Sequence, residues 1–257
     1  MFTSLRTLAL ACCAVALAAC EGDGVQDITG TRPESRIKFF NFGVNAPAVH
    51  FFAGDAKITA TTSATGVEST VGIASGGVGN GGLYSLIDPG QYTFTGRITA
   101  TVDKGLAITS VTGDIARGKA YSLYISGFYN TTTKQAEGFL VEDNFPETFD
   151  FSVAYVRFVN AISNANPMQL VITDATAGTS LPVGDAIAYK AGGAFIAVPP
   201  AQYNLATRYA GGTTNVITRT GVAFSGGRIY TITARGDITV TSTTAATRPQ
   251  LDNTLNR

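Results

Sequence analysis

The residues that most often perform catalysis or bind metals are scarce in this chain of 257 residues. It contains three Cys, no Trp and one His, His50. A Ser-His-Asp hydrolase needs its nucleophile on a Gly-x-Ser-x-Gly turn or beside the base, and a zinc site needs several ligands. His50 instead stands alone between Val49 and Phe51, which predicts a strand histidine. We expect no catalytic residue, no metal site and no cofactor, and hence a protein that is not an enzyme.

A glycine-rich segment formally satisfies the pattern of a dinucleotide-binding loop. Residues 77–82 read Gly-Val-Gly-Asn-Gly-Gly. Such a loop must follow a strand and open a helix, because the helix N-terminus holds the pyrophosphate. Here residues 83–87 and then Pro89 follow, which is typical of a strand. The segment is therefore interpreted as a loop without a nucleotide.

A group of carboxylates lies near the middle of the chain. Its members are Glu137, Glu142, Asp143, Glu147 and Asp150. Calcium uses such oxygens, but the Asp-x-Asp-x-Asp-Gly loop that arranges them is absent. We expect a solvated strand end and linker.

Two arginines and several aromatic residues are the candidates for a ligand surface. Arg97 and Arg208 occupy matched positions on the polar faces of two similar strands. They could contact a ligand in each of the two domains or simply keep the sheet face soluble. Phe40, Tyr124 and Tyr189 fall outside the expected core faces, and an exposed aromatic strip of this kind could stack on sugars.

The first residues have the layout of an export signal. Arg6 supplies a positive charge, and residues 8–19 form an apolar stretch without charge. That stretch is shorter than the roughly 20 residues that cross a bilayer, and it matches the apolar part of a signal peptide.

The end of this signal resembles the lipobox of bacterial lipoproteins, through Leu17, Ala18, Ala19 and Cys20. The resemblance implies that the Cys20 thiol receives a diacylglyceryl group, that residues 1–19 are removed, and that the new amino group is acylated. These chains would anchor the protein in a membrane. The alternative is a plain secreted protein in which Cys20 is a spectator. Residues 20–35 are predicted to form a lipidated tether, and Glu21 in place of Asp favours the outer membrane.

The remainder of the chain contains one unit twice. Four blocks recur in the same order, and the distance between copies falls from 119 residues at Ile37 and Val156 to 109 at Asp143 and Asp252. The matched blocks are residues 37–41 with 156–160, 89–92 with 200–203, 118–123 with 227–232, and 143–144 with 252–253. We predict two repeats, 36–147 and 153–257, joined by a short linker that holds them at a fixed angle.

Each repeat has the pattern of β-strands. Apolar and polar residues alternate along Tyr92 to Ile98, along Tyr121 to Ser126 and along Tyr230 to Arg235, as in strands with one buried and one wet face. Six aromatic residues fall on the expected core faces: Phe39, Tyr92, Tyr121, Phe158, Tyr203 and Tyr230. About seven short strands per repeat predict two tandem immunoglobulin-like β-sandwiches in an all-β chain. A single larger barrel is the alternative.

The repeated blocks resemble the family called domain of unknown function 4397. The resemblance lies in residues 156–161, residues 89–94 and the Gly-Lys/Arg-x-Tyr strands that end in Gly127 and Gly236. The first copy departs from the family pattern at Phe42 and Gly43. The resemblance implies exported or lipid-anchored bacterial proteins and brings no known reaction.

Composition limits the partners. Lys plus Arg and Asp plus Glu number 18 each, which disfavours nucleic acid as a partner. We predict a lipid-anchored cell-envelope protein with a non-catalytic binding or structural role toward an envelope protein. The alternatives are a glycan-binding surface module and, third, a hydrolase with two converging carboxylates.

Overall fold

The strands of the first repeat form two sheets. A computed structural model describes residues 35–59 and 70–257 of the protein. The strands of the first repeat are β1 (Ser35–Asn41), β2 (Val49–Ala53), β3 (Ala56–Lys57), β4 (Gly77–Val78), β5 (Ser85–Ile87), β6 (Gly90–Ile98), β7 (Ala107–Ile115), β8 (Ala120–Asn130) and β9 (Gln135–Glu142). One sheet has the order β4-β1-β8-β9, with β5 also paired to β1, and the other has the order β3-β2-β6-β7.

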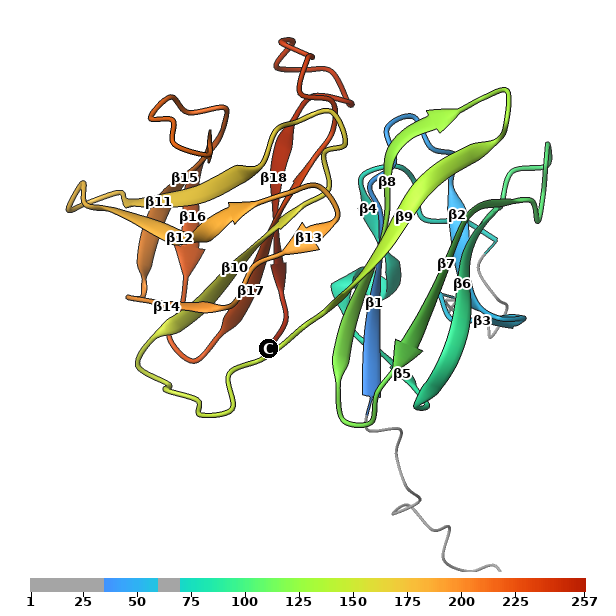
Figure 1. The fold of residues 1–257 in the computed structure, drawn as a ribbon, viewed down its shortest axis with the longest axis horizontal. Coiled ribbons are helices and arrows are strands. Elements are labelled where there is room, and N and C mark those ends of the chain that lie inside the picture. The colour runs from blue at the N-terminus through green and yellow to red at the C-terminus, as the bar shows by residue number, and fades with distance from the viewer. Residues whose placement is uncertain (1–34, 60–69) are drawn as a thin grey trace, which may run out of the picture. The chain divides into compact units, whose positions relative to one another are not determined.

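The second repeat copies this plan strand for strand (Figure 1). Its strands are β10 (Ala154–Asn160), β11 (Met168–Asp174), β12 (Ser180–Ile187), β13 (Ala191–Gly192), β14 (Ile196–Val198), β15 (Ala201–Tyr209), β16 (Ile217–Phe224), β17 (Ile229–Arg235) and β18 (Gln250–Leu255). Its sheets have the orders β13-β10-β17-β18, with β14 paired to β10, and β12-β11-β15-β16.

Each repeat also repeats an unusual pairing. The strands run antiparallel except for β1 beside β8 and β10 beside β17, which are parallel. The pairs align residue for residue, with Phe39 opposite Leu123 and Phe158 opposite Ile232. Gly127, inside β8, and Gly236, directly after β17, both have a positive φ at which a side chain would be strained. The prediction that the first of these strands ends at Gly127 is wrong, because β8 continues to Asn130.

The two sheets of each repeat enclose a hydrophobic core. In the first repeat the core includes Phe39, Phe51, Phe94 and Leu123, from both sheets. In the second it includes Phe158, Leu170, Tyr203 and Ile232. The prediction of an all-β fold made of β-sandwiches is confirmed. The described part of each repeat has nine strands rather than seven, since several are only two or three residues long.

Matched tyrosines stabilise matched turns. The hydroxyl of Tyr121 accepts a hydrogen bond from the amide of Ala116, and that of Tyr230 accepts one from Ser225, both at 3.1 Å. Of the six aromatics predicted to face the cores, all except the half-buried Tyr92 are buried. A phenol that is buried needs a polar partner, and here the preceding turn supplies it.

The prediction that one face of each strand is exposed to water is wrong for the two inner sheets, which are the sheet with β1 and β8 and the sheet with β10 and β17. Ser122, Tyr124 and Ser126 on β8 are buried, as are Thr231 and Thr233 on β17. Their sheet face packs against protein rather than water, as described below. By contrast, the alternation along β6 agrees with its half-exposed polar face.

Candidate functional site

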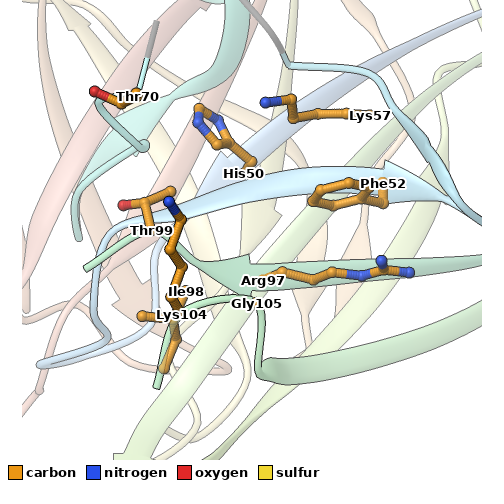
Figure 2. Close-up of a pocket in the computed structure, with 9 residues that line it drawn as sticks. All are labelled: His50, Phe52, Lys57, Thr70, Arg97, Ile98, Thr99, Lys104 and Gly105. Atoms are coloured by element: carbon orange, nitrogen blue, oxygen red, sulfur yellow. The ribbon is translucent and has the colours of Figure 1, made fainter. Parts of the chain in front are cut away.

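A pocket of about 280 Å³ lies on the first repeat, over β2 and β6 (Figure 2). Its lining includes His50 and Phe52 from β2, Arg97 from β6, and Lys57 from β3. Lys104 from the turn after β6 completes the cationic part of the lining. The strand period places His50, Phe52 and Arg97 on one sheet face, because His50 is directly opposite Arg97 in the β2–β6 register.

Arg97 is held in place by its own repeat. Its guanidinium stacks on the Phe52 ring at 4.2 Å from the centroid. The Nε atom donates to Thr95 Oγ1 at 3.0 Å, and Nη2 donates to the carbonyl of Gly54 at 2.9 Å. An exposed ion pair with Asp55 adds a contact at 3.5 Å. In Figure 2 the guanidinium extends along β6 away from His50, so Arg97 forms one wall of the pocket.

The two lysines approach the other end of the pocket. Figure 2 shows Lys57 extending toward His50 from β3, and Lys104 extending toward Thr99. The hydroxyls of Thr70 and Thr99 also line this end. Among the residues that the structure describes, the lining combines three cationic side chains with hydroxyl groups and the apolar side chains of Phe52 and Ile98.

The matched place in the second repeat is built differently. Gln169 is directly opposite Arg208, as His50 is opposite Arg97. Gln169 Nε2 donates to the carbonyl of Gly184 in β12 at 2.7 Å, and Arg208 Nε donates to Asn215 Oδ1 at 2.9 Å. Strand β12 spans eight residues, whereas its counterpart β3 spans two. Arg97 and Arg208 therefore share a register position but not an environment.

A second cluster of interest lies where the two repeats touch. Phe40, Phe42, Tyr124 and Phe139 of the first repeat pack with Val159 and Ala161 of the second. Tyr124 stacks between Phe40 and Phe139, with ring centroids at 4.5 and 4.9 Å. Phe40 and Tyr124, which the sequence placed in a possible exposed sugar-binding strip, are in fact buried. Tyr189 also contacts the other repeat, since its hydroxyl forms a hydrogen bond of 2.8 Å with Ser126 Oγ.

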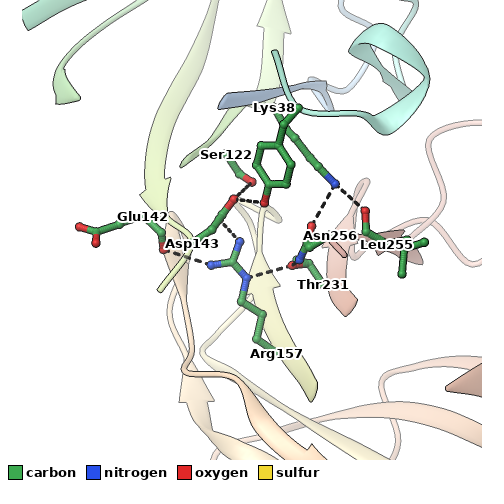
Figure 3. Close-up of polar contacts among 9 residues, drawn as sticks. Lys38, Ser122, Glu142, Asp143, Arg157, Thr231, Leu255 and Asn256 are labelled. Carbon is green, nitrogen blue, oxygen red and sulfur yellow. Dashed lines mark hydrogen bonds and ion pairs between the residues drawn. The ribbon is translucent and has the colours of Figure 1, made fainter. Parts of the chain in front are cut away.

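A buried ion pair accompanies this apolar contact (Figure 3). Arg157 on β10 pairs with Asp143, which follows β9, and both side chains are at most 1% exposed. Arg157 Nη1 also donates to the Glu142 carbonyl at 3.1 Å, and its Nε donates to Thr231 Oγ1 at 2.9 Å. Asp143 further accepts from the hydroxyls of Tyr84 and Ser122, at 2.6 and 2.9 Å. A buried carboxylate with this many donors is well compensated.

Lys38 is the counterpart of Arg157 in the first repeat. Its side chain extends to the second repeat, whereas that of Arg157 extends to the first. Lys38 is buried, and its Nζ donates to the Leu255 carbonyl at 2.6 Å and to Asn256 Oδ1 at 3.1 Å. Burial is the main cause that lowers the pKa of Lys38 to about 8, and the charges of Arg157 and Arg36 also lower it, against the opposing attraction of Asp143. Burial raises the pKa of the neighbouring Tyr84 above its ordinary value, and Asp143 raises it further.

The acidic residues near the middle of the chain, which were predicted to be solvated, therefore differ in their environments. Asp143 is a buried ion-pair partner, which corrects that prediction. Glu137 forms a half-exposed ion pair with Lys190 of the second repeat at 2.5 Å, and Glu142 pairs with Lys119 at 3.0 Å. No group of three or more His, Cys, Asp or Glu within residues 35–59 and 70–257 is arranged to hold a metal ion.

The glycine-rich segment adopts the loop that the sequence predicted. Gly79–Gly82 form a 3₁₀ turn between β4 and β5, with Asn80 and Gly81 in the left-handed region. A strand, β5, follows in place of a helix.

The lipidation residues Leu17, Ala18, Ala19 and Cys20 lie outside the described residues. Among the residues that are described, no helix is long and apolar enough to cross a membrane.

Sequence reasoning did not assign a role to Lys38, Arg157, Lys57 or Lys104. A signal existed for the first two, because both repeats place a basic residue inside an otherwise apolar strand block. A charge at that place favours a buried partner rather than solvent. No comparable signal marks the two pocket lysines, of which Lys57 lies on β3 and Lys104 lies in the turn after β6.

Comparisons with known proteins give the chain no family. A scan against models of protein families finds no match, and neither does a search of the curated proteins. Among solved structures, the chain is similar to the Bacillus anthracis TIE protein at 12% identity, with a TM-score of 0.23, over 79% of this chain and 34% of that one. It is also similar to a putative cell adhesion protein from Bacteroides ovatus at 13% identity, with a TM-score of 0.26, over 87% and 96%.

A third structure is a leucine-rich repeat protein from Bacteroides thetaiotaomicron, at 8% identity and a TM-score of 0.21, over 77% of this chain and 25% of that one. The chain thus spans about a third of the TIE protein and a quarter of the leucine-rich repeat protein. Likenesses at these TM-scores carry no argument about function.

Proposed function

We propose that this protein is a lipid-anchored cell-envelope protein that presents two β-sandwich modules, as one fixed pair, to a partner in the envelope. Its role is binding or structural rather than catalytic. Cys20 carries the lipid in this proposal, and residues 20–35 link the lipid to the modules. Each module is proposed to be of the type that the resemblance to domain of unknown function 4397 implies.

The observation that carries the proposal is the Arg157–Asp143 ion pair between the repeats. A charged pair that is at most 1% exposed excludes water from the contact around it. Separating the repeats would expose the Phe40 and Tyr124 face as well as break this pair. Because both costs oppose separation, the contact favours a rigid pair over two modules on a flexible string.

The same contact narrows the surfaces left for a partner. The inner sheet faces are covered, so a partner must use the sheets that contain β6 and β15, the sheet edges or the loops. The sugar-stacking alternative depended on Phe40 and Tyr124, both buried, and it loses that basis.

Cell fractionation of the full chain tests the anchor. We expect the protein in the membrane fraction and the Cys20→Ala variant in the soluble envelope fraction or unprocessed. Metabolic labelling with palmitate gives a direct readout, because only a chain lipidated at Cys20 incorporates label. Equal membrane binding without label in both forms would contradict the anchor.

Small-angle scattering and protease shaving test the presentation of the modules. A fixed pair predicts one compact scattering profile that fits a single arrangement of the repeats. Shaving of intact cells then reports which side of the membrane holds the modules. A profile that requires a broad ensemble of separations would contradict the fixed pair.

A further inference from the structure

We propose that the gap between β16 and β18 in the second repeat binds an acidic saccharide, with Arg219 and Arg248 holding the carboxylate of a uronic acid. The proposal rests on the binding role proposed above and deepens it by naming the chemistry of the envelope partner. It needs the fold of the second repeat, but neither the lipid anchor nor an aromatic surface on which sugar rings stack.

The corresponding gap in the first repeat is closed. Strands β7 and β9 lie at the edges of the two sheets of that repeat. A Cβ at Gly113 on β7 would lie 2.6 Å from Leu140 Cδ2, and a Cβ at Gly138 on β9 would lie 2.7 Å from Thr109 Oγ1. Both distances are too short for a side chain, so the two edges meet because glycine stands at these positions.

The second repeat has larger residues at these two places, and its edge strands β16 and β18 leave a cavity. Val222 and Leu251 occupy the register positions of Gly113 and Gly138. Both side chains are buried in the core between the sheets, which holds the edges apart. A cavity of about 390 Å³ is lined by residues of both strands, and this volume is within the range of ligand sites.

Two arginines line this cavity. Arg219 comes from β16, and its Nη1 donates to the carbonyl of Leu251 on β18 at 2.7 Å. Arg248 comes from the loop before β18, and its Nη1 donates to the carbonyl of Ala245 at 3.0 Å. A guanidinium has five N–H donors, so the bond to a backbone carbonyl leaves each arginine with donors for a ligand. A carboxylate suits these donors, because an arginine can bind both carboxylate oxygens through two parallel bonds.

The other polar groups of the cavity suit the hydroxyls of a sugar. Asp252 lines the cavity, but its charge is balanced by the ion pair with Arg235, so it does not repel an acidic ligand strongly. The Asp252 carboxylate accepts hydrogen bonds, while the Gln250 amide and the Thr218 hydroxyl both donate and accept them. Sugar hydroxyls also do both, so this mixed set can pair with a polyhydroxylated ring.

A second cavity, of about 430 Å³, adjoins the first. The two cavities share Thr218, Arg248 and Pro249. The second adds the hydroxyls of residues 241–243 and apolar side chains such as Val240. Two adjoining cavities of these sizes suit more than one sugar ring, with ring hydroxyls on the polar groups and ring C–H groups on the apolar ones.

The loop that carries Arg248, residues 236–249, is ordered by its own hydrogen bonds. The amide of Asp237 donates to the Thr247 carbonyl at 2.8 Å, which closes the loop. Asp237 Oδ1 also accepts from Asn164 Nδ2 at 2.7 Å, which ties the loop to the segment after β10. A loop that is ordered in advance lowers the entropy cost of binding a ligand.

Isothermal titration calorimetry on the full chain tests the site with trimers of galacturonic acid and of mannuronic acid. The methyl esters of both trimers are the neutral probes, because they keep the rings and the linkages. We expect saturable binding of at least one acid trimer. Its ester should bind about tenfold more weakly, because the charge-assisted bonds to the carboxylates are lost.

Three variants locate the binding. Arg248→Gln should weaken binding of the acid trimer by about tenfold, because it removes one guanidinium. Thr218→Val removes a hydroxyl that lines both cavities at nearly constant volume, and it should weaken binding by about threefold. Arg228→Gln is the control, since it makes the same charge change at an exposed residue before β17, at the other end of that strand from the cavity.

Four results would overturn the proposal. They are equal affinity for an acid trimer and its ester, unchanged binding in both Arg248→Gln and Thr218→Val, an equal loss in Arg228→Gln, and no saturable binding of either acid trimer to a chain with a native circular dichroism spectrum. Palmitate labelling and scattering report the anchor and the fixed pair separately. Failed saccharide binding with both of those intact would therefore refute this inference and leave the proposed function standing.

Discussion

The two repeats share one strand plan, yet they use the same positions differently. Lys38 and Arg157 occupy the same place in β1 and β10, and each reaches the end of the other repeat's last strand. Arg157 pairs there with the buried carboxylate of Asp143. Lys38 instead donates hydrogen bonds to the backbone carbonyl of Leu255 and the side-chain amide oxygen of Asn256.

The sequence matched Asp143 with Asp252, but the strand registers correct this match, because Glu142 lies opposite Tyr121 and Leu255 lies opposite the matched Tyr230. The structural counterpart of Asp143 is therefore Asn256, while Asp252 pairs with Arg235 inside its own repeat. A duplicated chain has thus become an asymmetric pair.

The largest expected effect comes from removing the carboxylate of this asymmetric pair. Asp143→Ala leaves Arg157 buried without a counter-charge, which should lower the free energy of unfolding by about 3–5 kcal/mol. Urea unfolding measures it. Asp252→Ala is the control, because its ion pair with Arg235 is partly exposed and its loss should cost about 1 kcal/mol. Equal losses in the two variants would show that the buried ion pair contributes no more to stability than a partly exposed one.

A pH series sharpens the contrast between the two basic residues. The pKa of Lys38 is lowered to about 8 in the folded protein, from 10.5. Between these values the unfolded chain binds more protons, so the contribution of Lys38 to stability rises with pH. From pH 7 to 10 the wild type should gain on the order of 2–3 kcal/mol of unfolding free energy relative to Lys38→Met.

Comparison with Lys38→Met removes the effect of tyrosine ionisation. Burial raises the pKa of Tyr124 to about 12, and Tyr84 is raised too, so both groups oppose stability at high pH in either protein. A difference between wild type and Lys38→Met that stays flat with pH would show that Lys38 is not held in its buried place.

A substitution at Gly192, where the two repeats approach each other closely, should have a smaller effect on stability. A Cβ at Gly192 on β13 would lie 2.9 Å from Val141 Cγ1 of the other repeat and 3.2 Å from Val159 Cγ2. Gly192→Ala should therefore destabilise the protein by about 1–2 kcal/mol through overpacking. Scattering on the same variant distinguishes a shifted contact from a lost one. Unchanged stability and an unchanged profile would mean that this contact yields easily.

The smallest expected effect is at the edge of the contact. Glu137 and Lys190 pair across the repeats, with side chains 51% and 39% exposed. Glu137→Gln should change the unfolding free energy by less than about 1 kcal/mol, since water screens the pair. A loss as large as that of Asp143→Ala would move the energetic centre of the contact from its buried middle to its rim.

The duplication and the β-sandwich fold were predictable from the sequence because strand alternation and repeated turns are local signals. The burial of the sheet faces where the two repeats touch was not predictable. Ser122, Thr231 and Lys38 look like solvent residues by type, and only the second repeat makes their face dry. Phe40 and Tyr124 were assigned to a possible open surface for the same reason. Arg97 lines a pocket together with Lys57 on β3 and Lys104 in the turn after β6, and a ligand role for Arg97 and Arg208 stays a prediction.

The parallel neighbours β1 and β8 have a consequence for how the protein folds. Arg36 pairs with Ala120, and Tyr155 with Ile229, so the opening strand of each repeat must wait for a strand far along the chain. Such high contact order predicts slow folding. While the second repeat is incomplete, the Phe40 and Tyr124 face of the first has no cover. The first repeat expressed alone should therefore self-associate through that face, with a second copy of the first repeat covering it in place of the second repeat.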